Sequence, residues 1–326
     1  MPTWGEILAE LNAVQQSTGQ LPYDSVRRKY LKALHQHTRR QTILYATKWT
    51  QTGTGTIEPA AVSITDEDIQ GFMEVIYGLK EKSLDLILHS PGGSAEAAEG
   101  IVTYLRSKFD DIRVIVPQAA MSAATMLACA ANQIVMGKHS FLGPIDPQFI
   151  LQTPIGVQAV PAHAILDQFK QAQNDCKNPQ LLSSWLPILS QYGPGLLVQC
   201  KNAIDLSQEL VKNWLHTYMF QGKTRNPSTR IAKKLAAHRD FKSHGRHIGI
   251  QQAISLGLVV EALENNHTLQ GTALSVYHAT MHTLAATNAV KIIENHLGRA
   301  FIKAQQPFVL QQPVFTPPPI HPPAQP

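Results

Sequence analysis

Two short segments of the chain carry the residue types that acyl-transfer chemistry requires. One is the Ser-Pro-Gly-Gly-Ser turn at 90–94, which follows the apolar run 84–88. The other places Ser122 among small apolar residues, shortly after the strand-like run 112–116. An activated serine hydroxyl attacks an acyl carbon, and free backbone amides stabilise the oxyanion that forms. Together, the two segments indicate chemistry on an acyl group.

Neither segment is specific on its own. Paired glycines are common wherever a turn needs positive φ, and a serine at a helix start is commonly a cap. A phosphate cradle is disfavoured, because neither Gly-Lys-Ser/Thr nor Gly-x-Gly-x-x-Gly occurs in the chain. The joint pattern is stronger, since both turns follow strands of consecutive βα units, at the sheet edge where open α/β folds bind ligands.

The elements around these turns predict an α/β fold. Strand patterns alternate with helix patterns at a spacing that favours a parallel sheet with right-handed crossovers. The expected strands are 42–47, 84–88, 112–116 and 133–136, and the expected helices are 66–80, 94–108 and the segment after Ser122.

The chain divides into four expected parts. An N-terminal helical segment covers 1–40, and the α/β domain covers 41–263 with a helical insertion at about 161–240. Within the domain, a helix over 250–256 ends at Gly257, before a strand at 258–260. A C-terminal helix is expected over 264–304. The tail 305–326 holds eight of the 21 prolines, which predicts an extended, disordered segment.

Composition and charge disfavour membrane, secreted and nucleic-acid-binding proteins. The 326 residues are 44% hydrophobic and only 16% charged, which favours a packed or oligomeric protein. No apolar stretch reaches the roughly 18 residues that a membrane helix needs, and the start does not read as a secretory signal, so a cytoplasmic protein without a transmembrane segment is expected. The basic residues of 27–40 favour a solvated helix over a nucleic-acid surface.

No cofactor or metal is expected. The three cysteines form no Cys-x-x-Cys pair, and the 14 histidines are scattered without a His-Glu-x-x-His motif. The chain has no dinucleotide fingerprint and no lysine in a recognisable pyridoxal-phosphate setting.

Further motifs complete a recognisable order. Asn-Gln-Ile-Val-Met-Gly stands at 132–137, Phe-Leu-Gly-Pro-Ile-Asp-Pro at 141–147, and Gly-Arg, Gln-Ala and Gly-Leu-Val follow one another within 245–259. With these motifs the chain resembles the Clp-fold serine peptidases over about 40–150 and 245–263. It is similar to signal peptide peptidase A and Clp protease subunits, and most similar to the cytosolic serine dehydrogenase proteinases. The resemblance implies a Clp/crotonase-like fold, an ATP-independent serine peptidase, a peptide or unfolded protein substrate and a homo-oligomer.

The resemblance also implies roles for the two turns. Ser122 corresponds to the nucleophile that forms the acyl-enzyme. The amides of Gly93 and Ala123 would form the oxyanion hole, and Gly92 would shape the turn.

The general base is less clearly marked. Asp146 stands where Clp subunits have histidine, and a carboxyl group that titrates at about 4 is a poor base for a serine hydroxyl. Signal peptide peptidases use a later lysine, for which Lys177 fits best and Lys170 next. His163 and His244 are further candidates.

Two other functions remain open at this stage. One is a crotonase-type enzyme acting on an acyl thioester, which would also use backbone amides to hold an oxyanion. The other is an inactive Clp-fold scaffold or binding subunit whose Pro-rich tail docks in an aromatic groove of a partner.

Overall fold

A seven-stranded sheet forms the centre of the protein, in a computed structural model that describes residues 2–51, 57–153, 156–224 and 226–305. The strand order is β10-β5-β3-β2-β1-β11-β12. The first five of these strands run parallel to one another. At one edge, β11 pairs antiparallel with β1, and β12 pairs antiparallel with β11. The strands are β1 (Gln41–Thr47), β2 (Ser83–His89), β3 (Asp111–Val116), β5 (Gln133–Met136), β10 (Val260–Ala262), β11 (Ala289–Asn295) and β12 (Ala300–Ala304).

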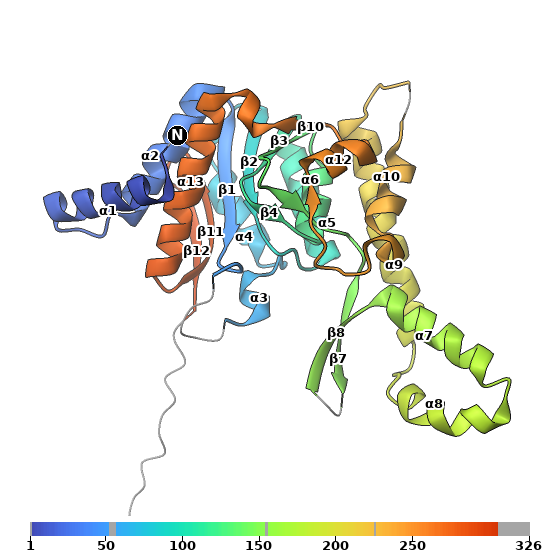
Figure 1. Cartoon of the computed structure of the whole chain (residues 1–326). Helices are drawn as coiled ribbons and strands as arrows, with labels where there is room; N and C mark the ends of the chain where they lie inside the picture. The colour runs from blue at the N-terminus through green and yellow to red at the C-terminus, as the bar shows by residue number, and fades with distance from the viewer. Residues whose placement is uncertain (1, 52–56, 154–155, 225, 306–326) are drawn as a thin grey trace, which may run out of the picture.

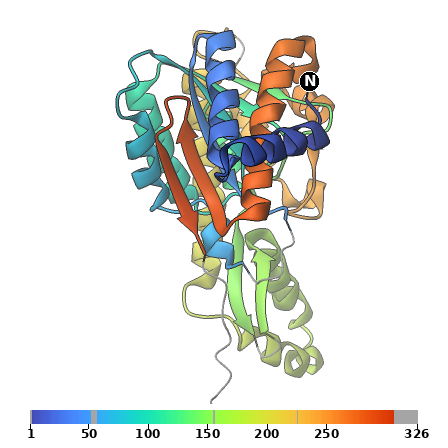
Figure 2. The ribbon, with the colours of Figure 1, turned by 90° about the vertical axis from the view of Figure 1, so that its left-hand side faces the viewer.

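Helices cover both faces of the sheet, as Figures 1 and 2 show. Alternate side chains along each strand therefore enter two different cores. In β1, Leu44 joins the cluster under α2 and α13, and Tyr45 joins the cluster under α4, α5 and α6. The covering helices are α2 (Tyr23–Thr38), α13 (His267–Ala286), α4 (Asp68–Ile76), α5 (Ala95–Lys108) and α6 (Ala123–Cys129).

Smaller elements complete the body. Helix α1 (Trp4–Thr18) packs on α13 and α2, and α3 (Pro59–Val62) lies beside β11. A second sheet is formed by β4 (Ala119–Ala120), β6 (Phe141–Leu142) and β9 (Ile248–Gly249), and β9 leads into α12 (Ile250–Leu256). Helix α12 ends at Gly257 with φ 105°, as expected from the sequence.

An appendage projects from the body between β6 and β9 (Figure 1). Its hairpin, which sequence reasoning missed, is followed by largely helical chain, and α7 and α9 share a small apolar core with Phe149 and Val160. The appendage consists of β7 (Gln148–Thr153), β8 (Gly156–Pro161), α7 (Ala162–Asp175), a 3-10 turn (Pro179–Leu181), α8 (Leu182–Leu189) and the first half of α9 (Leu196–Trp214). The second half of α9 packs in the main core, together with a π turn (Leu215–Met219), α10 (Ser228–Leu235) and α11 (His238–Phe241).

The expected C-terminal helix over 264–304 is wrong beyond Ala286. After a 3-10 turn (Leu263–Asn265), α13 stops at Ala286, and the remaining residues form the β11–β12 hairpin. The β-branched residues of Ala289–Asn295 favour a strand, and Gly298, with φ 88°, makes the turn. The sheet is accordingly mixed rather than wholly parallel. The expected tail lies, beyond Gln305, outside the described residues.

Three of the basic residues near the start of the chain pair with buried carboxylates. The Arg27 side chain is fully buried on Glu294 of β11, and Arg28 binds the same carboxylate at 2.6 Å. Arg40 pairs with the buried Asp85 at 2.8 Å. The expectation of a solvated helix face is therefore wrong for Arg27. Its guanidinium is buried, and the carboxylate of Glu294 compensates its charge.

Candidate active site

The two turns singled out in the sequence meet at the carboxyl ends of β2 and β3. Ser90 donates its backbone N–H to the carbonyl of Ala119 at 3.1 Å, and Met121 donates to the carbonyl of Ser90 at 3.0 Å. These bonds make a short parallel bridge between the two turns. The glycine turn and Ser122 are therefore held side by side by backbone pairing.

Ser122 has a backbone conformation that L-residues rarely adopt. Its φ is 51° and its ψ is −122°, close to a position that glycine usually fills in tight turns. It occupies the N-cap position of α6, yet its side chain makes no capping hydrogen bond. The hydroxyl is thus not engaged at the helix end, and the strained turn holds it at the start of a rigid element.

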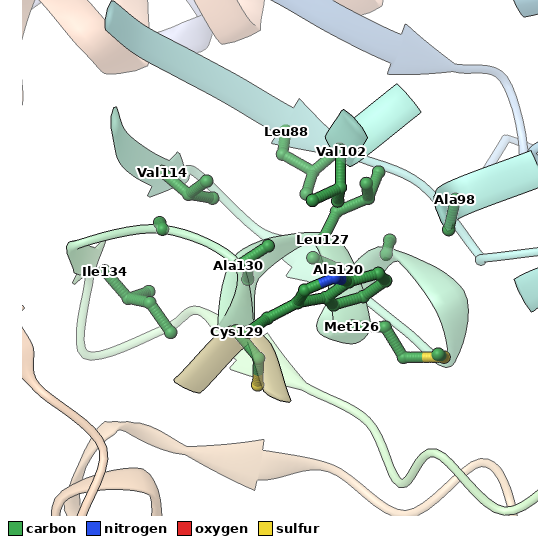
Figure 3. Packing of buried hydrophobic residues seen from close by; sticks show 14 of the residues in the cluster. Leu88, Ala98, Val102, Val114, Ala120, Met126, Leu127, Cys129, Ala130 and Ile134 are labelled. Carbon is green, nitrogen blue, oxygen red and sulfur yellow. The ribbon is translucent and has the colours of Figure 1, made fainter. Parts of the chain in front are cut away.

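Helix α6 is anchored by apolar packing. All of its residues are buried, and Met126, Leu127 and Cys129 belong to the same apolar cluster as Leu88 and Ile134 (Figure 3). Because Ala123 is the first residue of the helix, its N–H has no acceptor one turn earlier. That amide is available beside Ser122.

Gly92 lies directly against Ser122. Its φ is 97°, and a Cβ built on it would lie 2.7 Å from the Cβ of Ser122 and 2.8 Å from the amide nitrogen of Ala123. Any side chain at this position would occupy the space next to the serine. The contact explains why glycine is required there.

Gly93 is paired on its other side with Ile64. Ile64 donates to the carbonyl of Gly92 at 2.7 Å, and Ser94 donates to the carbonyl of Ile64 at 3.0 Å. In a parallel bridge of this type the N–H of the intervening residue points away from the partner strand. A Cβ on Gly93 would overlap the backbone of Ile64. The Gly93 amide is therefore turned away from Ile64, and the serine turn is bridged to this segment at Ser90.

A second group of polar residues surrounds Asp146. The carboxylate is fully buried and contacts the Nδ1 atoms of two histidines, His238 at 2.8 Å and His244 at 2.9 Å. The ring of His163 is parallel to that of His238, with centroids 6.4 Å apart. Burial lowers the pKa of His163, and the nearby carboxylate of Asp146 partly opposes this shift.

This group lies one short loop from the serine. Gly143 packs so closely on Met121, the neighbour of Ser122, that a Cβ would lie 3.2 Å from the Met121 Cα. Asp146 follows three residues later in the chain. Each histidine directs Nδ1 to the carboxylate, which leaves Nε2 for another partner, the arrangement in which a carboxylate orients a catalytic imidazole.

The two expected lysines lie on the appendage. Lys170 is on α7 and Lys177 just beyond its end, and both are exposed. Within the described residues, neither has a hydrogen bond or ion pair with Ser122. The structure thus joins Ser122, Gly92, Gly93 and Ala123, and separately joins Asp146, His163 and His244, and it leaves the lysines at the surface.

His238 was not among the site residues expected from the sequence. It stands at the start of α11, near the end of the helical insertion, and reaches Asp146 only through the folding of that insertion. No local spacing signals this contact. The described residues contain no group of three His, Cys, Asp or Glu side chains suited to a metal ion, and none of the helices in this part of the chain is long and apolar enough to cross a membrane.

Comparison with protein families decides the relationship. A family model described as ClpP-like SDH-type serine proteinase matches residues 24–290. The chain belongs to this family. The ClpP-like α/β fold and the relation to serine peptidases that the sequence suggested are thereby confirmed.

Two curated relatives of this family member are uncharacterized proteins of Methanocaldococcus jannaschii. MJ0137 is 32% identical over 204 residues, which cover 62% of this chain and 62% of that protein. MJ1495 is 36% identical over 225 residues, which cover 66% and 68%. The match thus spans less than two thirds of the length of MJ0137.

Solved structures similar to this ClpP-like chain include two variants of the 1510-N membrane-bound stomatin-specific protease, one of them in complex with a substrate peptide. Their sequence identities are 16% and 17%, and their TM-scores are 0.38 and 0.37. The alignments cover 64% and 61% of this chain, and 79% and 70% of those chains. The likeness is distant and carries no argument about the site.

Proposed function

We propose that the chain hydrolyses peptide bonds through an acyl-enzyme on Ser122. The observation that carries the proposal is the contact between Gly92 and Ser122, which holds an uncapped hydroxyl beside the amides of Gly93 and Ala123. Attack of the hydroxyl on a peptide carbonyl would place the new oxyanion within reach of these donors. Departure of the amine and attack by water would then release the acyl group. Family membership favours this reaction over the crotonase-type alternative.

For the general base, we propose one of the two histidines that Asp146 holds. A carboxylate that accepts from Nδ1 fixes the ring and leaves Nε2 to take the serine proton, whereas the two lysines are exposed on the appendage. His238 and His244 are therefore preferred to Lys177 and Lys170. The lysine base implied by the resemblance remains the competing prediction.

The resemblance also supports finer proposals. We propose ATP-independent turnover of peptides or unfolded proteins in the cytoplasm by a homo-oligomer. Degradation of an unfolded protein that proceeds at the same rate with and without ATP supports the first part. A monomeric mass in light scattering at the concentration used for the activity assay would contradict the proposed homo-oligomer.

A fluorophosphonate probe tests the central proposal. Labelling of the native protein that disappears in Ser122→Ala, with the adduct mapped to Ser122 by mass spectrometry, is the expected result. A folded native protein that takes no label contradicts the proposal and favours the inactive scaffold. Label on another residue would contradict the assignment of Ser122.

A further inference from the structure

A buried ion pair lies beneath the segment that pairs with Gly93. Lys291 of β11 contacts Asp68 of α4 with an Nζ–Oδ1 distance of 2.6 Å, and their side chains are 0% and 1% exposed. The same ammonium donates to the carbonyl of Ser63 at 2.7 Å. Neither residue belongs to the two turns that form the candidate active site.

The ion pair makes hydrogen bonds with the backbone on both sides of Ile64. Lys291 binds the carbonyl of Ser63, the preceding residue, and Asp68 accepts the N–H of Thr65, the following residue, at 3.0 Å. Ile64 in turn makes the two backbone hydrogen bonds that bracket Gly93. The position of the Gly93 amide is thus set by Ile64, and the position of Ile64 by the ion pair.

A second route connects the same carboxylate to the glycine turn. Tyr45 donates its hydroxyl to Oδ2 of Asp68 at 2.8 Å, and the same hydroxyl lies near the side chain of Ser90. The Ser90 hydroxyl accepts the N–H of Gly92 at 3.2 Å. Burial raises the pKa of Tyr45 well above its ordinary value, so the hydroxyl keeps its proton.

Fold stability alone gives little reason for such a network. A buried ion pair is often no more stabilising than well-packed apolar residues of the same volume, because both charges lose their hydration. The directional hydrogen bonds of this pair, in contrast, end on backbone groups at 63 and 65, on either side of the residue that pairs with Gly93.

We propose that Lys291, Asp68 and Tyr45 are positioning residues that hold the Gly92–Gly93 turn in the geometry of an oxyanion hole. The proposal rests on the proposed function of that turn. It adds a role for β11 and α4, whose side chains do not touch the reacting atoms. Loss of the network leaves Ser122 in place and moves the Gly93 amide.

The test compares inactivation kinetics by a fluorophosphonate probe. Tyr45→Phe removes one hydroxyl and keeps the ring, and Lys291→Met combined with Asp68→Asn removes both charges without leaving one unpaired. We expect kinact to fall about 10- to 100-fold with KI within about twofold of native, because a small displacement of a catalytic donor has effects of this order. Equal KI values would show that the probe still binds in the same site.

A matched pair controls for general destabilisation. Arg27 and Glu294 form another buried ion pair that also involves β11, and their other side-chain hydrogen bonds go to Asp24, Arg28 and Thr283 rather than to the 63–65 segment. Arg27→Met combined with Glu294→Gln is expected to lower the melting temperature and leave kinact unchanged. Hydrogen exchange of the peptide containing 90–94 should accelerate in the Tyr45 and Lys291 variants and not in this control.

The outcomes separate the two proposals. A native protein that takes no label contradicts the peptidase and, with it, the oxyanion hole. A native protein labelled on Ser122 whose Tyr45→Phe and Lys291→Met/Asp68→Asn variants keep native kinact contradicts only the positioning role. An equal fall of kinact in the Arg27 control assigns the effect to loss of stability and also contradicts that role.

Discussion

The α-carbon of Gly92 and the side chain of Ser122 are in direct contact, and the missing Cβ of the glycine is what makes the contact fit. A methyl group there would lie 2.6 Å from the carbonyl oxygen of Met121 as well as 2.7 Å from the serine Cβ. The two turns therefore meet at this contact, and a substitution at Gly92 is expected to disturb Ser122 as well.

The first prediction concerns this contact. Gly92→Ala is expected to reduce fluorophosphonate labelling at least about 100-fold, because the methyl group displaces the serine or the Ala123 amide. Gly100→Ala on α5 is the matched control, since its Cβ meets only Ile69 at an ordinary 3.6 Å. The control should label like the native protein and be about 0.5–1 kcal/mol more stable in urea titrations. Equal labelling of both variants would contradict the prediction.

The strained backbone of Ser122 leads to a second prediction. Ser122→Gly and Ser122→Ala both remove the hydroxyl, but only glycine adopts a φ of 51° and ψ of −122° without steric cost. The glycine variant is expected to be about 1 kcal/mol more stable than the alanine variant, although glycine usually destabilises. Thermal unfolding of the two variants measures this difference. A more stable alanine variant would show that the turn relaxes when the hydroxyl is lost.

The general base is the subject of a third prediction. His238→Gln and His244→Gln each keep a side-chain amide near Asp146, and the one that replaces the base should lower the labelling rate by about 10²–10⁴-fold. Lys170→Met and Lys177→Met are expected to label like the native protein. A large fall of the labelling rate in a lysine variant, with native rates in both histidine variants, would instead support a lysine as the base.

Acid stability provides a fourth prediction. His89, the last residue of β2, is fully buried, and burial lowers its pKa from 6.5 to about 3. Between these values the unfolded chain binds a proton that the folded chain does not. Stability is therefore complete above pH 6.5 and decreases as the pH falls toward 3, by about 2 kcal/mol at pH 5 from this group.

The measurement is urea unfolding of native protein and His89→Gln at pH 7 and pH 5. The variant should lose less stability between the two pH values than the native protein does. His296, whose pKa burial lowers to about 4, should supply part of the remaining loss. Identical losses in the two proteins would contradict the role of His89.

The sequence was informative where a local pattern sets the structure. Strand and helix periodicities predicted the parallel βα units, and the turn composition predicted that 90–94 and Ser122 would meet at one sheet edge. The positive φ of Ser122 was not predictable, because serine at a helix start ordinarily caps the helix with negative φ.

The sequence was misleading where tertiary contacts decide. Residues 289–295 are buried on both faces, so they lack the alternation that marks a half-buried strand and were assigned to the preceding helix. The contacts of Asp146 with His238 and His244 join segments separated by the whole appendage. No spacing rule connects such residues. For the same reason, the contact of Lys291 with Asp68 was not predictable from the sequence.

The pairing of β1 with β11 has a consequence for how the protein is made. Strand β1, at residues 41–47, has its partner β2 soon after it in the chain, but its other partner at 289–295 is synthesised much later. Until then, one side of β1 presents unpaired N–H and C=O groups, and edges of this kind recruit other chains. The nascent protein is therefore most prone to aggregation before β11 emerges from the ribosome, and chaperone dependence should be greatest for chains truncated just before residue 289.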